Sequence, residues 1–120
     1  RPIATDVSFG SAPDVSSEKY ASLGKGTMIG YAPSLDRKMS VRLAAIAKEK
    51  GIASQPEVMG GRTGTNCDEI QISGSGVRTA LLSIPIRNMH TAAELCDLAD
   101  IEATARLMAE YIAEGGKADA

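Results

Sequence analysis

The residues best suited to chemistry are an aspartate inside an early β-forming run and the only histidine of the chain. Asp6 interrupts the strand-like segment Ile3–Phe9, and His90 follows an apolar run that is stopped by Pro85. An ionised carboxylate within a strand is costly unless a cation or hydrogen-bond donors compensate it. A carboxylate oxygen and an imidazole nitrogen would together suit a hard or borderline divalent cation such as zinc.

Simpler interpretations exist for both residues. A histidine after a strand commonly serves as a surface residue or as a hydrogen-bonded structural residue. An edge strand that points Asp6 at water would equally explain the carboxylate. Two ligands cannot close a zinc site, because structural and catalytic sites both need more. The residue types alone therefore leave the choice between ligand and structural residue open.

The segment 60–65, Gly-Gly-Arg-Thr-Gly-Thr, could present backbone N–H groups to a substrate carbonyl or carboxylate. It lacks the endings of a P-loop and of a dinucleotide-binding fingerprint, so nucleotide binding is not expected. A flexible turn between a strand and a helix is the alternative. Residues 23–26, Leu-Gly-Lys-Gly, are likewise expected to form a turn with a solvated lysine. Cys67 would need a nearby base to act as a nucleophile, and we predict a buried cysteine instead.

Several strands must position these residues. Runs of β-forming or apolar residues predict strands at 3–9, 27–31, 55–59 and 78–84, the last of them buried on both faces. Strands that alternate with helices indicate an α/β layer structure with at least some parallel pairs. In such sheets, chemistry gathers where strands end and loops begin, a condition that Asp6 and His90 both meet.

Three helices are expected between and after these strands. One runs from residue 39 or 40 to Lys50 and ends at Gly51. A short helix opens at residue 65 or 66. The last helix is capped by Asp97 or Asp100 and ends at residues 115–116. Its inward stripe is predicted to consist of Ile101, Ala105, Met108 and Ile112.

Composition narrows the classes of protein. A chain of 120 residues with 43% hydrophobic and 23% charged residues suits one globular domain. Thirteen basic and fifteen acidic residues give a net charge of -2, and no basic stripe supports nucleic-acid binding. No apolar run approaches the ~18 residues of a membrane span. Cys67 and Cys96 form no disulfide framework or zinc motif, so a cytoplasmic location is expected.

Five motifs in sequence resemble the C-terminal half of the catalytic domain of peptidase family M42. These are the glutamyl aminopeptidase and endoglucanase M-like proteins, also known as tetrahedral aminopeptidases. The resemblance extends from Ile3 to about Ala113. Residues 1–116 are expected to form the C-terminal portion of such a domain, and 117–120 a disordered tail. The motifs are Asp6-Val7-Ser8, Leu23-Gly24-Lys25-Gly26, Asp36-Arg37-Lys38-Met39, Gly61-Arg62-Thr63-Gly64-Thr65-Asn66, and Ser83 to Thr91 with its Pro-Ile-Arg-Asn-Met-His core.

The resemblance implies a mixed-sheet zinc-peptidase layer structure of the phosphorylase/hydrolase-like type, and a dinuclear metalloaminopeptidase that acts on peptides. It implies two divalent ions, zinc or cobalt, with Asp6 a ligand of one and His90 a ligand of the other. Residues of the glycine-rich segment would line the substrate cleft: Gly60, Gly61, Thr63 and Thr65. The resemblance also implies a homo-oligomer.

The family's remaining ligands belong to a His-x-Asp motif, a bridging aspartate and a Glu-Glu pair that includes the general base. The resemblance places all of them upstream of residue 3, so no catalytic base is expected in this chain, and the chain alone is predicted to be inactive. Asn66 departs from the aspartate that many relatives carry there, and Cys67 is uncommon in the family. The alternative is a non-catalytic α/β binding or structural module.

Overall fold

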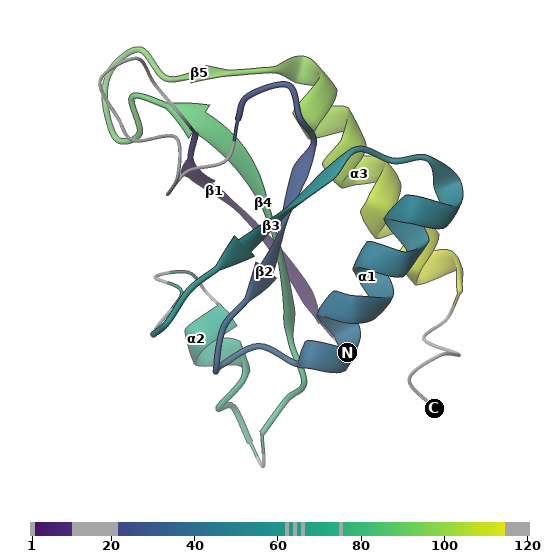
Figure 1. Ribbon diagram of the computed structural model, residues 1–120. Coiled ribbons are helices and arrows are strands. Elements are labelled where there is room, and N and C mark those ends of the chain that lie inside the picture. Colours follow the sequence, from purple (N-terminus) through teal and green to yellow (C-terminus); the bar gives the residue numbers. More distant parts are fainter. Residues whose placement is uncertain are drawn as a thin grey trace.

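The computed structural model describes residues 2–10, 22–61, 63, 65, 67–74 and 76–114. Its strands form one mixed sheet in the order β1-β4-β2-β3, with β5 paired to β4 (Figure 1). β1 pairs with β4 and β2 with β3 in parallel, whereas β2 and β5 run antiparallel to β4. The predicted α/β class with some parallel pairs is therefore confirmed. The strands are β1 (Ile3–Phe9), β2 (Thr27–Tyr31), β3 (Ser54–Val58), β4 (Ala80–Arg87) and β5 (Leu95–Cys96).

β4 runs farther than predicted, because Pro85 does not stop it. The Gly10 N–H donates to the Ile86 carbonyl at 2.7 Å, so the backbone groups of Ile86 that make sheet hydrogen bonds face β1. Those of Pro85 face the other side, where pairing with β2 ends at Ser83 and pairing with β5 begins at Ile86. The missing N–H of Pro85 therefore removes no ladder bond, and the strand continues to Arg87.

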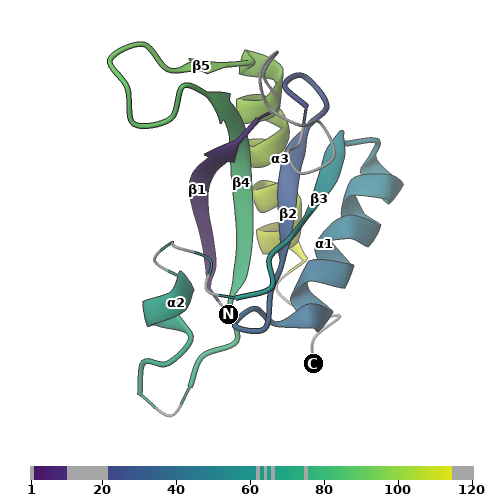
Figure 2. The same ribbon diagram turned by 60° about the vertical axis from the view of Figure 1, so that its left-hand side comes forward.

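Two long helices, α1 (Arg37–Lys50) and α3 (Leu98–Ala113), cover one face of the sheet, and the short α2 (Cys67–Ile70) lies on the other (Figure 2). α1 begins slightly before the predicted start, because the Asp36 side chain caps it by accepting from Met39 N at 2.9 Å. It ends at Gly51, whose φ of 67° suits glycine, as predicted. The expected short helix is present as α2, which begins at Cys67, one residue after the later of the two expected starts.

The predicted inward stripe of α3 is wrong at three of its four residues, whereas Met108 is partly buried and packs against the main core. Ile101 and Ile112 are 40% and 67% exposed, and Ala105 is exposed as well. The buried face consists of Asp100, Ala103, Thr104, Leu107 and Tyr111. The reason is that both carboxylate oxygens of Asp100 accept backbone N–H groups, from Gly24 and Gly26 at 2.8 Å each. Asp97, one of the two predicted caps, accepts from Ala99 N.

The turn at residues 23–26 requires glycine on two counts. Gly24 and Gly26 have φ of 82° and 108°, a region that L side chains rarely adopt. A Cβ on Gly26 would also lie 2.1 Å from the Ala53 carbonyl oxygen. The turn is therefore fixed both by its backbone and by its contact with Asp100.

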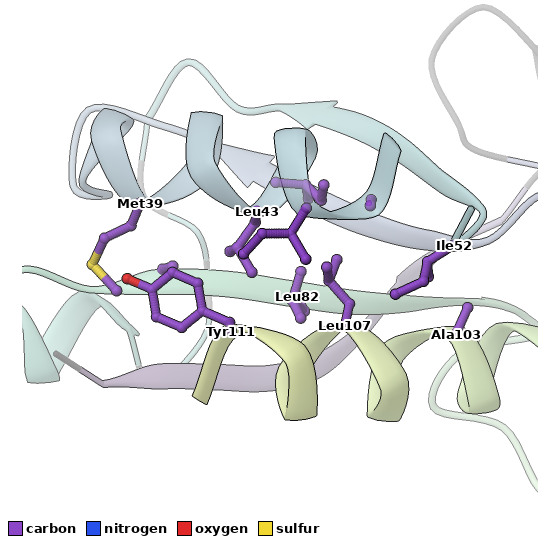
Figure 3. Close-up of a cluster of buried hydrophobic side chains, with 11 residues drawn as sticks. Met39, Leu43, Ile52, Leu82, Ala103, Leu107 and Tyr111 are labelled. Atoms are coloured by element: carbon purple, nitrogen blue, oxygen red, sulfur yellow. The ribbon is translucent and has the colours of Figure 1, made fainter. Parts of the chain in front are cut away.

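The main hydrophobic core lies between the sheet and the two long helices. Leu82 of β4 packs there against Leu43 of α1 and Leu107 of α3 (Figure 3). A smaller cluster on the opposite face joins Leu81 to Cys67 and Leu35. β4 is thus buried on both faces, as predicted. In the described residues, no helix is long and apolar enough to cross a membrane. The predicted tail at 117–120 lies outside the described residues.

Candidate functional site

Asp6 and His90 line one cavity of about 290 Å³. The parallel pairing of β1 with β4 brings them there, because it carries both strands toward the same edge of the sheet, where β4 leads into the turn that holds His90 (Figure 1). Thr63 and Thr65 of the glycine-rich segment line the same cavity, as does Ser8. The structure thus brings together four of the six predicted site residues.

Asp6 does not interrupt its strand, since β1 runs on to Phe9. Its side chain is half-buried, and its Oδ1 atom accepts a hydrogen bond from the N–H of Val7 at 2.8 Å. β1 is an outer strand of the described sheet, but Asp6 forms part of a cavity wall and does not stand in open solvent. A single backbone donor leaves the carboxylate with further acceptor capacity.

His90 lies in a tight turn with an unusual backbone. Asn88 and His90 have φ of 57° and 63°, and among the described residues they are the only ones other than glycine with positive φ. Such conformations are tolerated by Asn and His but cost on the order of 1–3 kcal/mol, so the surroundings must hold them. The Asn88 carbonyl accepts from both the N–H and the hydroxyl of Thr91, at 3.2 and 2.6 Å. This turn presents the exposed His90 side chain to the cavity.

The threonines of the cavity wall are held by a carboxylate behind them. Asp68 Oδ1 accepts from the Thr63 N–H and hydroxyl, at 3.0 and 2.9 Å. The hydroxyls of Thr63 and Thr65 are 2.7 Å apart, and Thr65 Oγ1 accepts from Cys67 N. Asp68 itself is buried. Hydrogen bonds thus hold Thr63 and Thr65 together in the cavity wall.

Gly60 and Gly61 are both exposed and do not line this cavity. A Cβ added to either would meet nothing within 4 Å, so the space around them does not require glycine. Their assignment to substrate binding stays a prediction. Residues 62, 64 and 66, which complete the same motif, lie outside the described part of the chain.

Two polar contacts at the cavity were missed by the sequence analysis. The Ser8 hydroxyl donates to Glu57 Oε2, which links β1 to β3. Because these strands are far apart in the sequence, no local pattern indicates this contact. Thr65 and Asp68 have the spacing of a capping box. That pattern would place Asp68 on the Thr65 N–H, whereas Asp68 accepts from Thr63 and the Thr65 N–H donates to the Thr63 hydroxyl.

Cys67 is fully buried, as predicted. Burial is the largest influence on its thiol and raises its pKa above the ordinary value, and the Asp68 charge adds to this. Its Sγ lies 3.5 Å from the Ala80 carbonyl oxygen. A protonated, inaccessible thiol is a poor nucleophile, so the cavity offers no cysteine chemistry from this residue.

The donor atoms at the cavity suit a divalent metal ion, with one carboxylate oxygen and one imidazole nitrogen. Among the described residues, no group of three or more His, Cys, Asp or Glu side chains is placed to hold an ion. Asp6 and His90 can therefore supply part of a coordination shell. The remaining ligands would have to come from elsewhere.

Comparison with known proteins gives aminopeptidases as relatives. A lysyl aminopeptidase from Pyrococcus furiosus is 37% identical over 112 residues, which is 93% of this chain and 32% of the relative. An aminopeptidase from the archaeon Desulfurococcus kamchatkensis superposes with a TM-score of 0.80 at 30% identity, covering 88% of this chain and 32% of that one. A TET aminopeptidase from the marine sediment archaeon Thaumarchaeota archaeon SCGC AB-539-E09 gives 0.83 at 25% identity, covering 92% and 32%.

These relatives are all peptidases. More narrowly, the chain belongs to the M42 glutamyl aminopeptidase family, whose model matches residues 2–107. This confirms the resemblance drawn from the five motifs. The chain spans about a third of the length of these relatives.

Proposed function

We propose that this chain is the C-terminal part of the catalytic domain of a dinuclear metalloaminopeptidase, which hydrolyses N-terminal residues from peptides. The observation that carries the proposal is the shared cavity of Asp6 and His90, which joins an oxygen and a nitrogen donor from distant parts of the chain. Membership of the aminopeptidase family supports the same reaction.

In this proposal Asp6 holds one divalent ion and His90 the other, with zinc or cobalt as the metals. Such a pair, when bound, supplies an activated water and polarises the scissile carbonyl. Thr63 and Thr65 line the cavity and are proposed to face the peptide. Gly60 and Gly61, which do not line it, are proposed to contact the substrate beside the cavity. The sheet is proposed to be the corresponding part of a zinc-peptidase layer structure.

The general base and the other ligands are proposed to lie upstream in a longer protein. Support comes from the share of the relatives that the chain covers, about a third. The 120-residue chain alone is therefore expected to have negligible peptidase activity. We further propose a homo-oligomeric, cytoplasmic parent protein, and light scattering of the full-length protein would test the assembly.

The decisive test is hydrolysis of aminoacyl anilides by the full-length protein, before and after removal of metal with a chelator. Lysyl and glutamyl substrates belong in the panel, because one relative is a lysyl aminopeptidase and the family is described as glutamyl. We expect hydrolysis that the chelator abolishes and that zinc or cobalt restores. Hydrolysis that is insensitive to the chelator would contradict the proposal, and no hydrolysis of any substrate would favour a non-catalytic module.

A further inference from the structure

Ser83 lies beside Asp6 in the sheet. In the parallel pairing of β1 with β4, Asp6 is the register partner of Ser83. On its other side Ser83 is paired with Met28 of β2. Directly paired residues in neighbouring strands place their side chains on the same face, with Cβ atoms about 5 Å apart.

The packing confirms which face this is. Side chains alternate along a strand, so Ser83 shares a face with Leu81, and Asp6 shares a face with Ala4. Leu81 and Ala4 both belong to the small cluster around Cys67, on the side of the sheet opposite α1 and α3. Ser83 and Asp6 therefore point to the same side, the side of α2.

The Ser83 hydroxyl is buried without a partner. The residue is 1% exposed, and in the described part of the chain its Oγ is the only buried side-chain nitrogen or oxygen with no hydrogen bond. A buried hydroxyl left unsatisfied costs free energy, so such a group calls for an explanation. Its neighbour Met28 offers only a thioether, which is a weak acceptor.

We propose that Ser83 is a positioning residue whose hydroxyl donates a hydrogen bond to the Asp6 carboxylate when that carboxylate holds a metal ion. This inference rests on the proposed function. Asp6 has acceptor capacity beyond its bond from Val7 N, and a hydroxyl hydrogen rotates freely to meet it. A donor of this kind fixes the orientation of a ligating carboxylate, as outer partners of metal ligands do.

The test is metal binding by the full-length protein and its Ser83→Ala variant, measured by zinc titration of the metal-free forms against a competing chelator. We expect the variant to bind zinc about 10–100-fold more weakly, the usual effect of losing an outer partner. We also expect its metal-free form to be as stable as the parent or more stable, because the substitution removes an unsatisfied polar group.

Ser40→Ala is the matched control. The Ser40 hydroxyl is also buried, but it donates to the Gly30 carbonyl at 2.8 Å and lies outside the cavity. This variant should lose stability and keep its zinc affinity, the opposite of the result expected for Ser83→Ala. Ser83→Cys, which is close in size and a weaker donor, provides a second variant in case the alanine protein does not fold, and it too should bind zinc more weakly.

The outcomes separate the two proposals. If Asp6→Ala abolishes binding at one site while Ser83→Ala and Ser83→Cys bind like the parent, the role of Ser83 is overturned and the proposed function stands. If the parent binds neither zinc nor cobalt, or if binding survives Asp6→Ala unchanged, the metal assignment itself fails and the role of Ser83 fails with it. A loss of metal-free stability in Ser83→Ala as large as that in Ser40→Ala would show a structural role instead.

Discussion

His90 and Asn88, two positions earlier, both have a left-handed backbone conformation. Of these two residues, His90 lines the cavity of Asp6 and Asn88 does not. This pair allows the backbone contribution to be separated from the imidazole contribution. A glycine at either position can adopt the same positive φ without steric cost.

We therefore predict that His90→Gly leaves the free energy of unfolding within about 1 kcal/mol of the parent value, since relief of strain offsets the added chain entropy. In the full-length protein the same change should lower zinc content and abolish aminopeptidase activity. Asn88→Gly, the control, should keep both. Metal analysis and anilide hydrolysis measure the outcome, and a fully active His90→Gly protein would remove His90 from the site.

Asp100 fixes the turn at Gly24 and Gly26, because each carboxylate oxygen accepts one backbone N–H. An asparagine offers only one oxygen and leaves a buried N–H unsatisfied. We expect Asp100→Asn to lower the free energy of unfolding by about 1–3 kcal/mol, as measured by urea denaturation. Glu102→Gln, at an exposed position of the same helix, should change it by less than about 0.5 kcal/mol. Equal stability of the two variants would refute the role of Asp100.

The ion pair of Asp36 with Arg78 predicts a pH dependence of stability. The hydrogen bond from Arg78 Nε, at 2.6 Å, is the main reason that the pKa of Asp36 lies below its ordinary value of 3.8, although partial burial opposes it. A carboxyl with a depressed pKa in the folded state adds stability that is fully present above the unfolded pKa. That stability is lost as the pH falls from about 3.8 through the folded pKa.

Asp36→Asn isolates this effect, because asparagine still caps α1 but carries no charge. At neutral pH it should be less stable by under about 1 kcal/mol, since Arg78 is partly exposed. The difference from the parent should shrink as the pH drops below 3.8. Asp36→Ala should lose about 1 kcal/mol more through the cap. A difference between parent and Asp36→Asn that grows at low pH would contradict the sign of the pKa shift.

The two cysteines should react at very different rates with a thiol reagent. Cys96 is exposed, whereas Cys67 is buried and its thiol has a raised pKa. In the native chain near pH ~8 we expect one thiol to react rapidly and the second only after denaturation. Cys96→Ser should abolish the rapid reaction, and a rapid reaction that survives it would show that Cys67 is accessible.

Local features of the fold could be predicted from the sequence. The end of α1 depends on Gly51, and the first N–H of α2 donates to the hydroxyl of nearby Thr65, so nearby residues are sufficient in both cases. The stripe of α3 was predicted wrongly because its rotation depends on Asp100 meeting a turn far away in the sequence. The extension of β4 through Pro85 depends on which strands flank it, and this too is not a local property.

At the site, too, some features could be predicted from the sequence and others could not. Asp6, His90, Thr63 and Thr65 were named from motifs, and the structure places all four at one cavity. The contact of Ser8 with Glu57 and the isolation of the Ser83 hydroxyl arise only from strand order and register. Motifs therefore indicated the residues that line the cavity, but tertiary pairing determines what lies beside them.

The pairing of β1 with β4 also governs when the cavity can form during folding. β2, α1, β3 and α2 all lie between these two strands in the sequence, so their pairing closes a loop that contains most of the chain. Closure of long loops costs entropy before the new contacts compensate, and folds rich in such contacts form slowly. We expect α1 to form early and the cavity to assemble in the slow step that joins the two ends of this loop.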